Sequence, residues 1–243
     1  MPSNIPLSQI QKQLRSESLY GCAICGCPVL EFVNMTTNSL YTEVFLPENM
    51  VALCPLHHTM YTTGAISEHS LYDAKNSPYN KVHQEDVFSI PESLDMSVNI
   101  GRCTFINTSR ILVVHDFDII SIKMVEGKYI LLDINFFDKL NNLIAIVSEN
   151  TWTAEKRSKD WIISYKPRHL TIQNQQNNTI FEAKMENYTN EITLTADGLY
   201  YNGYLIKITE EEILCNGEEI ATELKGTKLK NYEVGIAVEG VLK

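Results

Sequence analysis

The chain shows two patterns of hydrophobic and polar positions, and the change between them falls near residue 90. Before it, Leu7, Ile10 and Leu14 recur at helical spacing and predict a helix over residues 5–17, with Ser8 as its N-cap. After it, short runs alternate apolar and polar residues at the period of a β-strand. The pattern therefore predicts an α+β protein whose C-terminal part is all-β.

The N-terminal pattern continues with further short elements. Residues 30–35 and 40–45 are strand-like runs separated by a polar turn, so they predict a hairpin. A helix is expected over residues 49–63. A second helical pattern runs over 67–86 and is interrupted at Pro78.

Residues 87–97 show little periodicity and predict a linker, which places one domain at 1–86 and another at 98–243. The C-terminal strands are expected over residues 98–107, 111–115, 119–124, 129–135, 143–147, 161–165, 170–173, 179–184, 191–195, 199–202 and 204–208. Residues 209–213 would form at most one helical turn.

Strands of this length with short polar turns fit a sandwich, a barrel or a parallel β-solenoid, and the spacing does not choose between them. The Asn202-Gly203 dipeptide lies between two apolar runs and predicts a type I′ hairpin. Antiparallel pairing is therefore expected at that point.

Composition describes an ordinary globular protein of 243 residues, 44% hydrophobic and 21% charged. The formal net charge is −10, and residues 1–90 carry four Lys and Arg against eight Asp and Glu. Because nucleic-acid binding relies on neutralising phosphates, this acidity disfavours tight non-specific DNA binding. With no apolar leader and no apolar run near 20 residues, we expect a reducing, cytoplasmic location and no membrane partner.

Residues with metal-binding chemistry gather in the N-terminal part. Cys22 and Cys25 form a Cys-x-x-Cys pair, and Cys54 and His57 form a Cys-x-x-His pair about 30 residues later. Three sulfurs and one nitrogen are typical of a closed, structural zinc site. The sequence therefore predicts a structural zinc on these four residues, with Cys27 as an alternative to Cys25.

The run PENMVALCPLHHT at residues 47–59, together with CAICG at 22–26, resembles the zinc-containing branch of the HNH endonuclease family. The resemblance covers about residues 5–86. It implies a ββα-metal fold in which a hairpin and a helix hold one catalytic divalent cation beside a histidine base.

The chain departs from the family at the positions that carry the chemistry. By the resemblance, Asn34 takes the place of the base, Asn49 matches the family's middle Asn, and His58 matches a metal ligand. Thr62 stands where a further His or Asp is expected. An Asn amide cannot take a proton from water, and Thr is a poor ligand for a hard cation. The expected catalytic set, Asn34, Asn49 and His58, is therefore degenerate, and Mg²⁺ or Mn²⁺ would be a cofactor only in an active nuclease.

One basic and aromatic segment stands out in the β part. Its members lie within 13 residues: Lys156, Arg157, Lys159, Lys166 and Arg168, with Trp161 and Tyr165 among them. Such a segment could take up phosphates and stack bases. It could equally be a solvated sheet edge whose lysines prevent edge-to-edge association.

Three functions compete at this level. The favoured one is a degenerate HNH-like, zinc-binding, non-catalytic module that contacts a protein or nucleic-acid partner, and a homo-oligomer is compatible with it. The resemblance implies a bacterial or phage defence setting. The alternative is a metal-dependent HNH DNA endonuclease with an atypical active site. A carbohydrate- or surface-binding β domain is the third and rests on the solenoid analogy alone.

Overall fold

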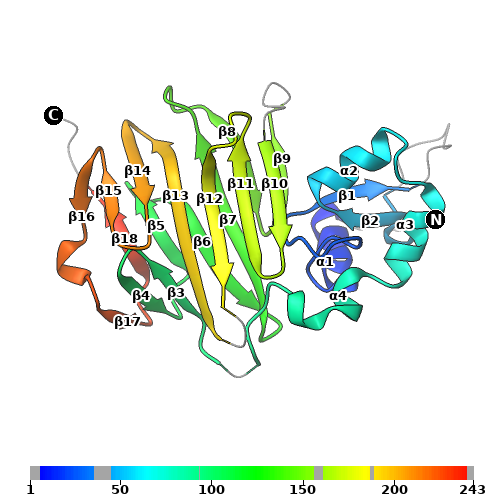
Figure 1. The fold of residues 1–243 in the computed structure, drawn as a ribbon, viewed down its shortest axis with the longest axis horizontal. Coiled ribbons are helices and arrows are strands. Elements are labelled where there is room, and N and C mark those ends of the chain that lie inside the picture. Colours follow the sequence, from blue (N-terminus) through cyan, green and yellow to red (C-terminus); the bar gives the residue numbers. More distant parts are fainter. Residues whose placement is uncertain (1–5, 36–44, 93, 156–160, 187–188, 240–243) are drawn as a thin grey trace. The chain divides into compact units, whose positions relative to one another are not determined.

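The computed structural model describes residues 6–35, 45–92, 94–155, 161–186 and 189–239 (Figure 1). The chain divides into two compact units. The first contains Met1–Phe88 with Tyr165–Pro167, and the second contains Ser89–Ser164 with Arg168–Lys243. The structure therefore has the mixed α+β composition expected, with a β-rich C-terminal part.

The first unit combines a small hairpin with short helices. Its elements are α1 (Leu7–Glu17), β1 (Glu31–Asn34), β2 (Met50–Leu53), α2 (Pro55–Thr62), α3 (Glu68–Asn76) and α4 (Tyr79–Val82), with 3₁₀ turns at Pro47–Asn49 and Gln84–Asp86. The two strands pair antiparallel, with Glu31 opposite Leu53 and Asn34 opposite Met50.

The two faces of this hairpin are covered by different helices. Ile10 and Leu14 of α1 pack with Met50 and Phe32 in one buried cluster. Because successive side chains of a strand point to opposite faces, Phe32 and Asn34 share the α1 side, and Glu31 lies on the other side. The α2 helix packs against both strands.

Two expectations for this unit are corrected, and a third lies mostly outside the described residues. Pro6, and not Ser8, is the N-cap of α1. The strand that pairs with β1 is β2, which occupies the first residues of the helix expected over 49–63. The helix, α2, therefore begins later, at Pro55. The strand expected over residues 40–45 falls mostly outside the described residues, and Phe45 is not in a strand.

The helical expectation over 67–86 is confirmed. Ser67 caps α3 by accepting a hydrogen bond from the Ser70 N–H (3.1 Å), and the chain leaves the helix before Pro78. Pro78 then precedes α4, where its fixed φ is compatible with a helix start.

The described strands of the second unit join in one 16-stranded sheet. They are β3 (Ser97–Ile100), β4 (Cys103–Ile106), β5 (Arg110–Val114), β6 (Phe117–Val125), β7 (Tyr129–Phe137), β8 (Leu143–Ser148), β9 (Thr151–Ala154), β10 (Trp161–Lys166), β11 (His169–Asn174), β12 (Thr179–Met185), β13 (Glu191–Tyr201), β14 (Tyr204–Ile208), β15 (Ile213–Cys215), β16 (Glu218–Ile220), β17 (Lys228–Lys230) and β18 (Val234–Val238). Figure 1 shows β10 to β13 in one layer in front of β6 to β8.

The sheet folds over on itself where β13 meets β7, at the single pair Tyr200 and Phe137. Strands that are neighbours in the sequence pair antiparallel along most of this sheet, as between β11, β12 and β13. A parallel solenoid would stack its coils in parallel, so the solenoid alternative is wrong. The parallel contacts instead join distant segments, β3 with β13, β17 with β4 and β18 with β5.

The predicted hairpin at Asn202-Gly203 is confirmed. Tyr201 pairs with Tyr204, and both turn residues have positive φ (47° and 83°), as a type I′ turn requires. Three other expectations need correction. Residues 98–107 form two strands joined at Gly101, residues 191–201 form the single strand β13, and residues 209–213 contain no helical turn.

The division between the units falls inside the expected linker of residues 87–97. Several of its side chains are buried, among them Val87, Phe88 and Ile90. Ser89 bridges to Tyr129, and the Ile90 N–H donates to the Lys128 carbonyl (2.9 Å), so this segment belongs to the second unit from Ser89 onward.

Candidate metal centre

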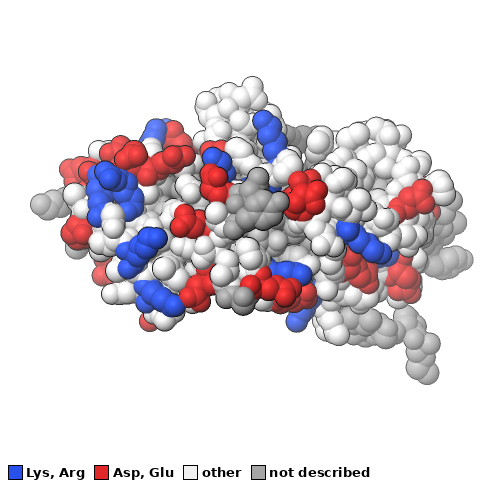
Figure 2. Space-filling model, turned by 60° about the horizontal axis from the view of Figure 1, so that its bottom comes forward, with Lys and Arg blue, Asp and Glu red and all other residues white. Residues whose placement is uncertain are grey.

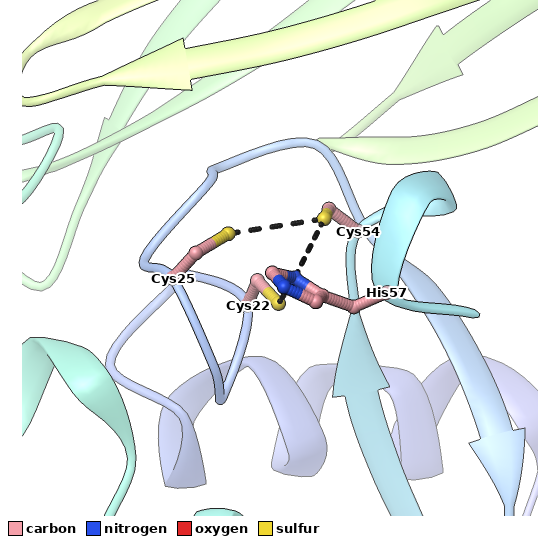
Figure 3. A group of neighbouring side chains, drawn as sticks. All are labelled: Cys22, Cys25, Cys54 and His57. Atoms are coloured by element: carbon pink, nitrogen blue, oxygen red, sulfur yellow. Dashed lines mark hydrogen bonds between the residues drawn. The ribbon is translucent and has the colours of Figure 1, made fainter. Parts of the chain in front are cut away.

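The loop from Cys22 to Cys27 is a tight knuckle. The Cys22 N–H donates to the Cys27 carbonyl (2.8 Å), and the Gly26 N–H donates back to the Cys22 carbonyl (2.9 Å). Gly26 has a φ of 74°, a conformation that favours glycine. These two bonds curl the loop so that the sulfurs of Cys22 and Cys25 lie on the same side (Figure 3).

The second ligand pair comes from the junction of β2 and α2. Cys54 follows the strand and is the N-cap of α2, with Pro55 at the first helical position, and His57 lies in the first turn. The Ala23 N–H donates to the Ala52 carbonyl (2.9 Å), which fastens the knuckle to β2. Figure 3 shows the four side chains converging on one point.

The spacing of the four side chains fits a tetrahedral zinc. The ligand atoms of Cys22, Cys25, Cys54 and His57 all lie within 4.8 Å of one another. Cys25 Sγ lies 3.8 Å from Cys54 Sγ, and His57 Nδ1 lies 3.3 Å from Cys54 Sγ and 3.5 Å from Cys22 Sγ. With Zn–S bonds of about 2.3 Å and Zn–N bonds of about 2.0 Å, tetrahedral geometry separates two sulfurs by about 3.8 Å and sulfur from nitrogen by about 3.5 Å.

The electrostatics of the cluster favour a thiolate at Cys54, whereas hydrogen bonds with Cys22 and Cys54 raise the pKa of the Cys25 thiol. Hydrogen bonds from the neighbouring thiols, Cys22 first, lower the pKa of Cys54, and its place at the N-terminus of α2 favours a thiolate as well. Hydrogen bonds to the Cys22 and Cys54 sulfurs raise the pKa of His57 to about 10. A cation bound here would displace these protons, so its affinity would fall in acid.

Cys27 lies next to the cluster without belonging to it. It is buried, its thiol donates to the Val29 carbonyl (3.7 Å), and burial raises its pKa. The four-residue group contains Cys25 and not Cys27. The geometry therefore favours Cys25 over the alternative that the spacing left open.

A residue that the sequence did not single out supports the knuckle from α4. Asn80 is 1% exposed, and its Nδ2 donates to the Leu19 carbonyl (2.8 Å). A Cβ at Gly21 would lie 2.4 Å from Asn80 Nδ2, and one at Gly26 would lie 2.5 Å from its Oδ1. Both glycines are thus required by the close approach of Asn80, a contact between segments more than 50 residues apart.

The expected catalytic residues are not brought together as a nuclease would need. His58 follows His57 on α2, and its Nδ1 contacts the Glu31 carboxylate, which raises the pKa of His58. Glu31 and Asn34 are three residues apart in β1, so their side chains point to opposite faces of the hairpin. Asn34 therefore lies on the α1 side and His58 on the Glu31 side. No sequence signal pointed to Glu31, because a single Glu at the start of a strand is usually solvated.

Asn49 and Thr62, the other two positions taken from the resemblance, each take part in a hydrogen bond to a backbone carbonyl. The Asn49 carbonyl accepts from the Met35 N–H (2.8 Å), which closes the base of the hairpin. The Thr62 hydroxyl is exposed and donates to the Thr59 carbonyl one turn earlier (3.0 Å).

The structure gives little support to the basic segment of the β part as a nucleic-acid surface. Residues 156–160 lie outside the described chain. Arg168 is only 7% exposed, so it contributes little to an exposed basic surface, and Trp161 packs against Phe136 (centroids 5.0 Å apart). On the face that Figure 2 shows, acidic and basic side chains are interspersed.

Comparison with protein-family models, with curated proteins and with solved structures gave no match. Among the helices of the described residues, none is long and apolar enough to cross a membrane.

Proposed function

We propose that the first unit is a zinc-stabilised, HNH-like module without nuclease activity, which contacts a protein or nucleic-acid partner. The observation that carries this proposal is the tetrahedral spacing of the four ligand atoms of Cys22, Cys25, Cys54 and His57. Three sulfurs and one nitrogen complete the coordination of zinc, so no position stays open for water or substrate. Such a site supplies folding energy and not catalysis.

The surface of this unit supports an interaction role. Leu56 on α2 and Val82 on α4 are 57% and 63% exposed, so both apolar side chains are accessible to a partner. A groove of about 800 Å³ runs between α2, α3 and α4, and Met60, Ile66 and Tyr79 contribute to its lining. A zinc site that fixes α2 also fixes one wall of this groove, because His57 lines it.

The absence of nuclease activity follows from the positions of Asn34 and His58. General-base catalysis needs a base within hydrogen-bond reach of the water that the cation activates. Here the residue at the base position is an amide, and it lies on the other face of the hairpin from His58. Each departure alone would slow the reaction, and together they remove both the base and its geometry.

One observation keeps the endonuclease as a second candidate. Glu31 and His58 place a carboxylate and an imidazole side by side at the hairpin–helix junction, and these are two ligand types that Mn²⁺ accepts. In that case the pair would hold a divalent cation, with the remaining ligands supplied by water and phosphate.

Two measurements test the proposal. Metal analysis of the purified full chain should give one zinc per protein and none in Cys54→Ser. A plasmid-nicking assay with Mg²⁺ or Mn²⁺ should show no cleavage above that of His58→Ala. A metal-free protein with an unchanged melting temperature would contradict the zinc site. Cleavage by the wild type that is lost in His58→Ala would establish the second candidate instead.

A further inference from the structure

The second unit contains a cavity that the zinc site does not explain. It lies at one end of this unit, between the two layers, and has a volume of about 330 Å³. Phe136 and Ile144 line it from β7 and β8, and Trp161, Ile180 and Leu199 line it from β10, β12 and β13. Its walls are mostly apolar and partly aromatic, and Asp138, Lys139 and Asn174 add polar groups.

The cavity opens to solvent at its mouth, so a small molecule can enter it from outside. An engineered apolar cavity of about 150 Å³ is sufficient to bind benzene. The cavity here is about twice that size and falls within the range of small-molecule pockets, so its volume suits a two-ring molecule.

Irregularities in the sheet open the layers at this end. The β7–β8 register shifts between Phe136 and Phe137, and the β13–β14 register shifts between Asp197 and Leu199, across Gly198 with its φ of 93°. β-Bulges bend a strand and redirect its side chains, and they are frequent next to binding sites. Both shifts occur at residues that line the cavity or adjoin it.

Two loops of the same conformation frame the mouth, one from each layer. Asp138 Oδ1 accepts from the N–H groups of residues 140 and 142, and Asn174 Oδ1 accepts from those of 176 and 178. The fourth residue of each loop, Asn141 and Asn177, has a positive φ (64° and 60°). The Asn202 N–H also donates to Asn141 Oδ1 (2.7 Å), which ties the β13–β14 turn to the Asp138 loop.

The mouth carries one cation that is free to meet a ligand. Lys139 is exposed, and its Nζ lies 5.7 Å from the centre of the Tyr200 ring, which also lines the cavity. Within the described part of the chain, no carboxylate forms an ion pair with Lys139. The neighbouring Asp138 carboxylate is occupied by its own loop, including Asn142 Nδ2 (2.9 Å).

We propose that this cavity binds a small aromatic acid. The flat ring system lies in the cavity against Phe136 and Trp161, and the carboxylate or other anionic group stays at the mouth beside Lys139. Ring stacking and apolar burial supply most of the affinity. The exposed charge pair adds preference for an acid over a neutral analogue.

The test uses the full chain and two probes, naphthalene-2-carboxylate and its neutral counterpart 2-naphthalenemethanol, titrated by calorimetry and by tryptophan fluorescence. We expect 1:1 binding of the acid with a dissociation constant of about 1 mM or tighter, as the size of the probe allows. Lys139→Gln should weaken the acid about two- to fivefold and leave the alcohol unchanged, since exposed ion pairs contribute this much. Lys228→Gln, which removes an exposed lysine of β17, is the matched control.

A second set of variants tests the proposal by filling the cavity with a larger side chain. Ile144→Trp, or Ile180→Phe if the first variant does not melt like the wild type, should abolish binding of both probes. Absence of saturable binding by the wild type would overturn the proposal. So would binding that Ile144→Trp and Ile180→Phe leave intact, because the probes would then occupy another place. Equal loss in Lys139→Gln and Lys228→Gln would overturn the role of Lys139.

Discussion

The imidazole of His58 on α2 is bound by the carboxylate of Glu31 on β1, the strand residue paired with Leu53. The pair joins the helix that carries a metal-ligand candidate, His57, to the hairpin beneath it. It also fixes the side of the hairpin on which His58 lies. The arrangement therefore bears both on the stability of the unit and on the proposal that it lacks nuclease activity.

Glu31→Gln should destabilise the first unit in a pH-dependent way. The hydrogen bond to the Glu31 carboxylate raises the pKa of His58, so the protonated imidazole is favoured in the folded state. The stabilisation is complete below the pKa of about 6.5 in the unfolded chain and is lost as the pH rises through the higher folded value. Because both side chains are about one-third exposed, the loss at pH 6 should be about 1 kcal/mol or less. Chemical denaturation at pH 6 and pH 9 measures it, and the exposed Glu48→Gln is the control. A difference that grows with pH would contradict the assignment.

Cys25 and Cys27 should respond differently to substitution. Cys25→Ala removes a ligand and should release the zinc, with a loss of folding free energy on the order of 10 kcal/mol, enough to unfold this unit. Cys27→Ala should keep one zinc per chain and cost only the packing of a buried thiol. Metal analysis with a thermal melt distinguishes them, and the opposite pattern would show that Cys27 is the ligand.

Restoring the family's residues should not restore cleavage. Asn34→His with Thr62→Asp supplies a base and a hard-metal ligand, yet residue 34 stays on the α1 side of the hairpin and His58 on the other. We therefore expect the double variant to nick plasmid DNA no faster than His58→Ala in Mn²⁺. Activity that needs both substitutions would show that the hairpin presents position 34 to the cation after all.

Asn80→Ala should weaken the zinc knuckle without touching a ligand. The substitution leaves the Leu19 carbonyl without this donor and opens space beside Gly21 and Gly26, which costs about 1–3 kcal/mol. The rate of zinc loss to a chelator should rise accordingly. Asn76→Ala, an exposed position at the end of α3, is the control and should change neither quantity. Equal zinc-release rates in both variants would exclude a role for Asn80 at the site.

The loop at Asp138 should tolerate Asn but not Ala. Hydrogen bonds from Asn142, its side chain first, lower the pKa of Asp138, so the stabilisation is present above pH 4 or so and is lost as the pH falls through the lower folded value. Asn174 makes the same backbone bonds with an uncharged side chain. Asp138→Asn should therefore keep the melting temperature at neutral pH and remove this acid dependence, whereas Asp138→Ala should lower the melting temperature. Equal melting temperatures for the Asn and Ala variants would contradict the role of these bonds.

Local signals in the sequence were sufficient for several features. The Cys-x-x-Cys and Cys-x-x-His spacings indicate the metal-ligand candidates, because each pair is brought together by a short turn or one helical turn, although the choice of Cys25 over Cys27 needed the structure. Asn202-Gly203 specifies its hairpin through the positive φ of both residues. The helical pattern of 67–86 is also confirmed, since Ser67 caps α3 and Pro78 marks the interruption before α4.

Only the tertiary structure decided the rest, because the deciding contacts join segments far apart in the chain. A four-residue apolar run such as Met50–Leu53 is compatible with helix or strand, and its pairing with β1 makes it a strand. The same pairing places Asn34 on the α1 side of the hairpin, whereas His58 contacts the opposite side. Asn80 meets Gly21 and Gly26 across more than 50 residues. The cavity of the second unit lies where register shifts occur in two separate strand pairs. The period-2 alternation of one strand does not reveal the register of its partner.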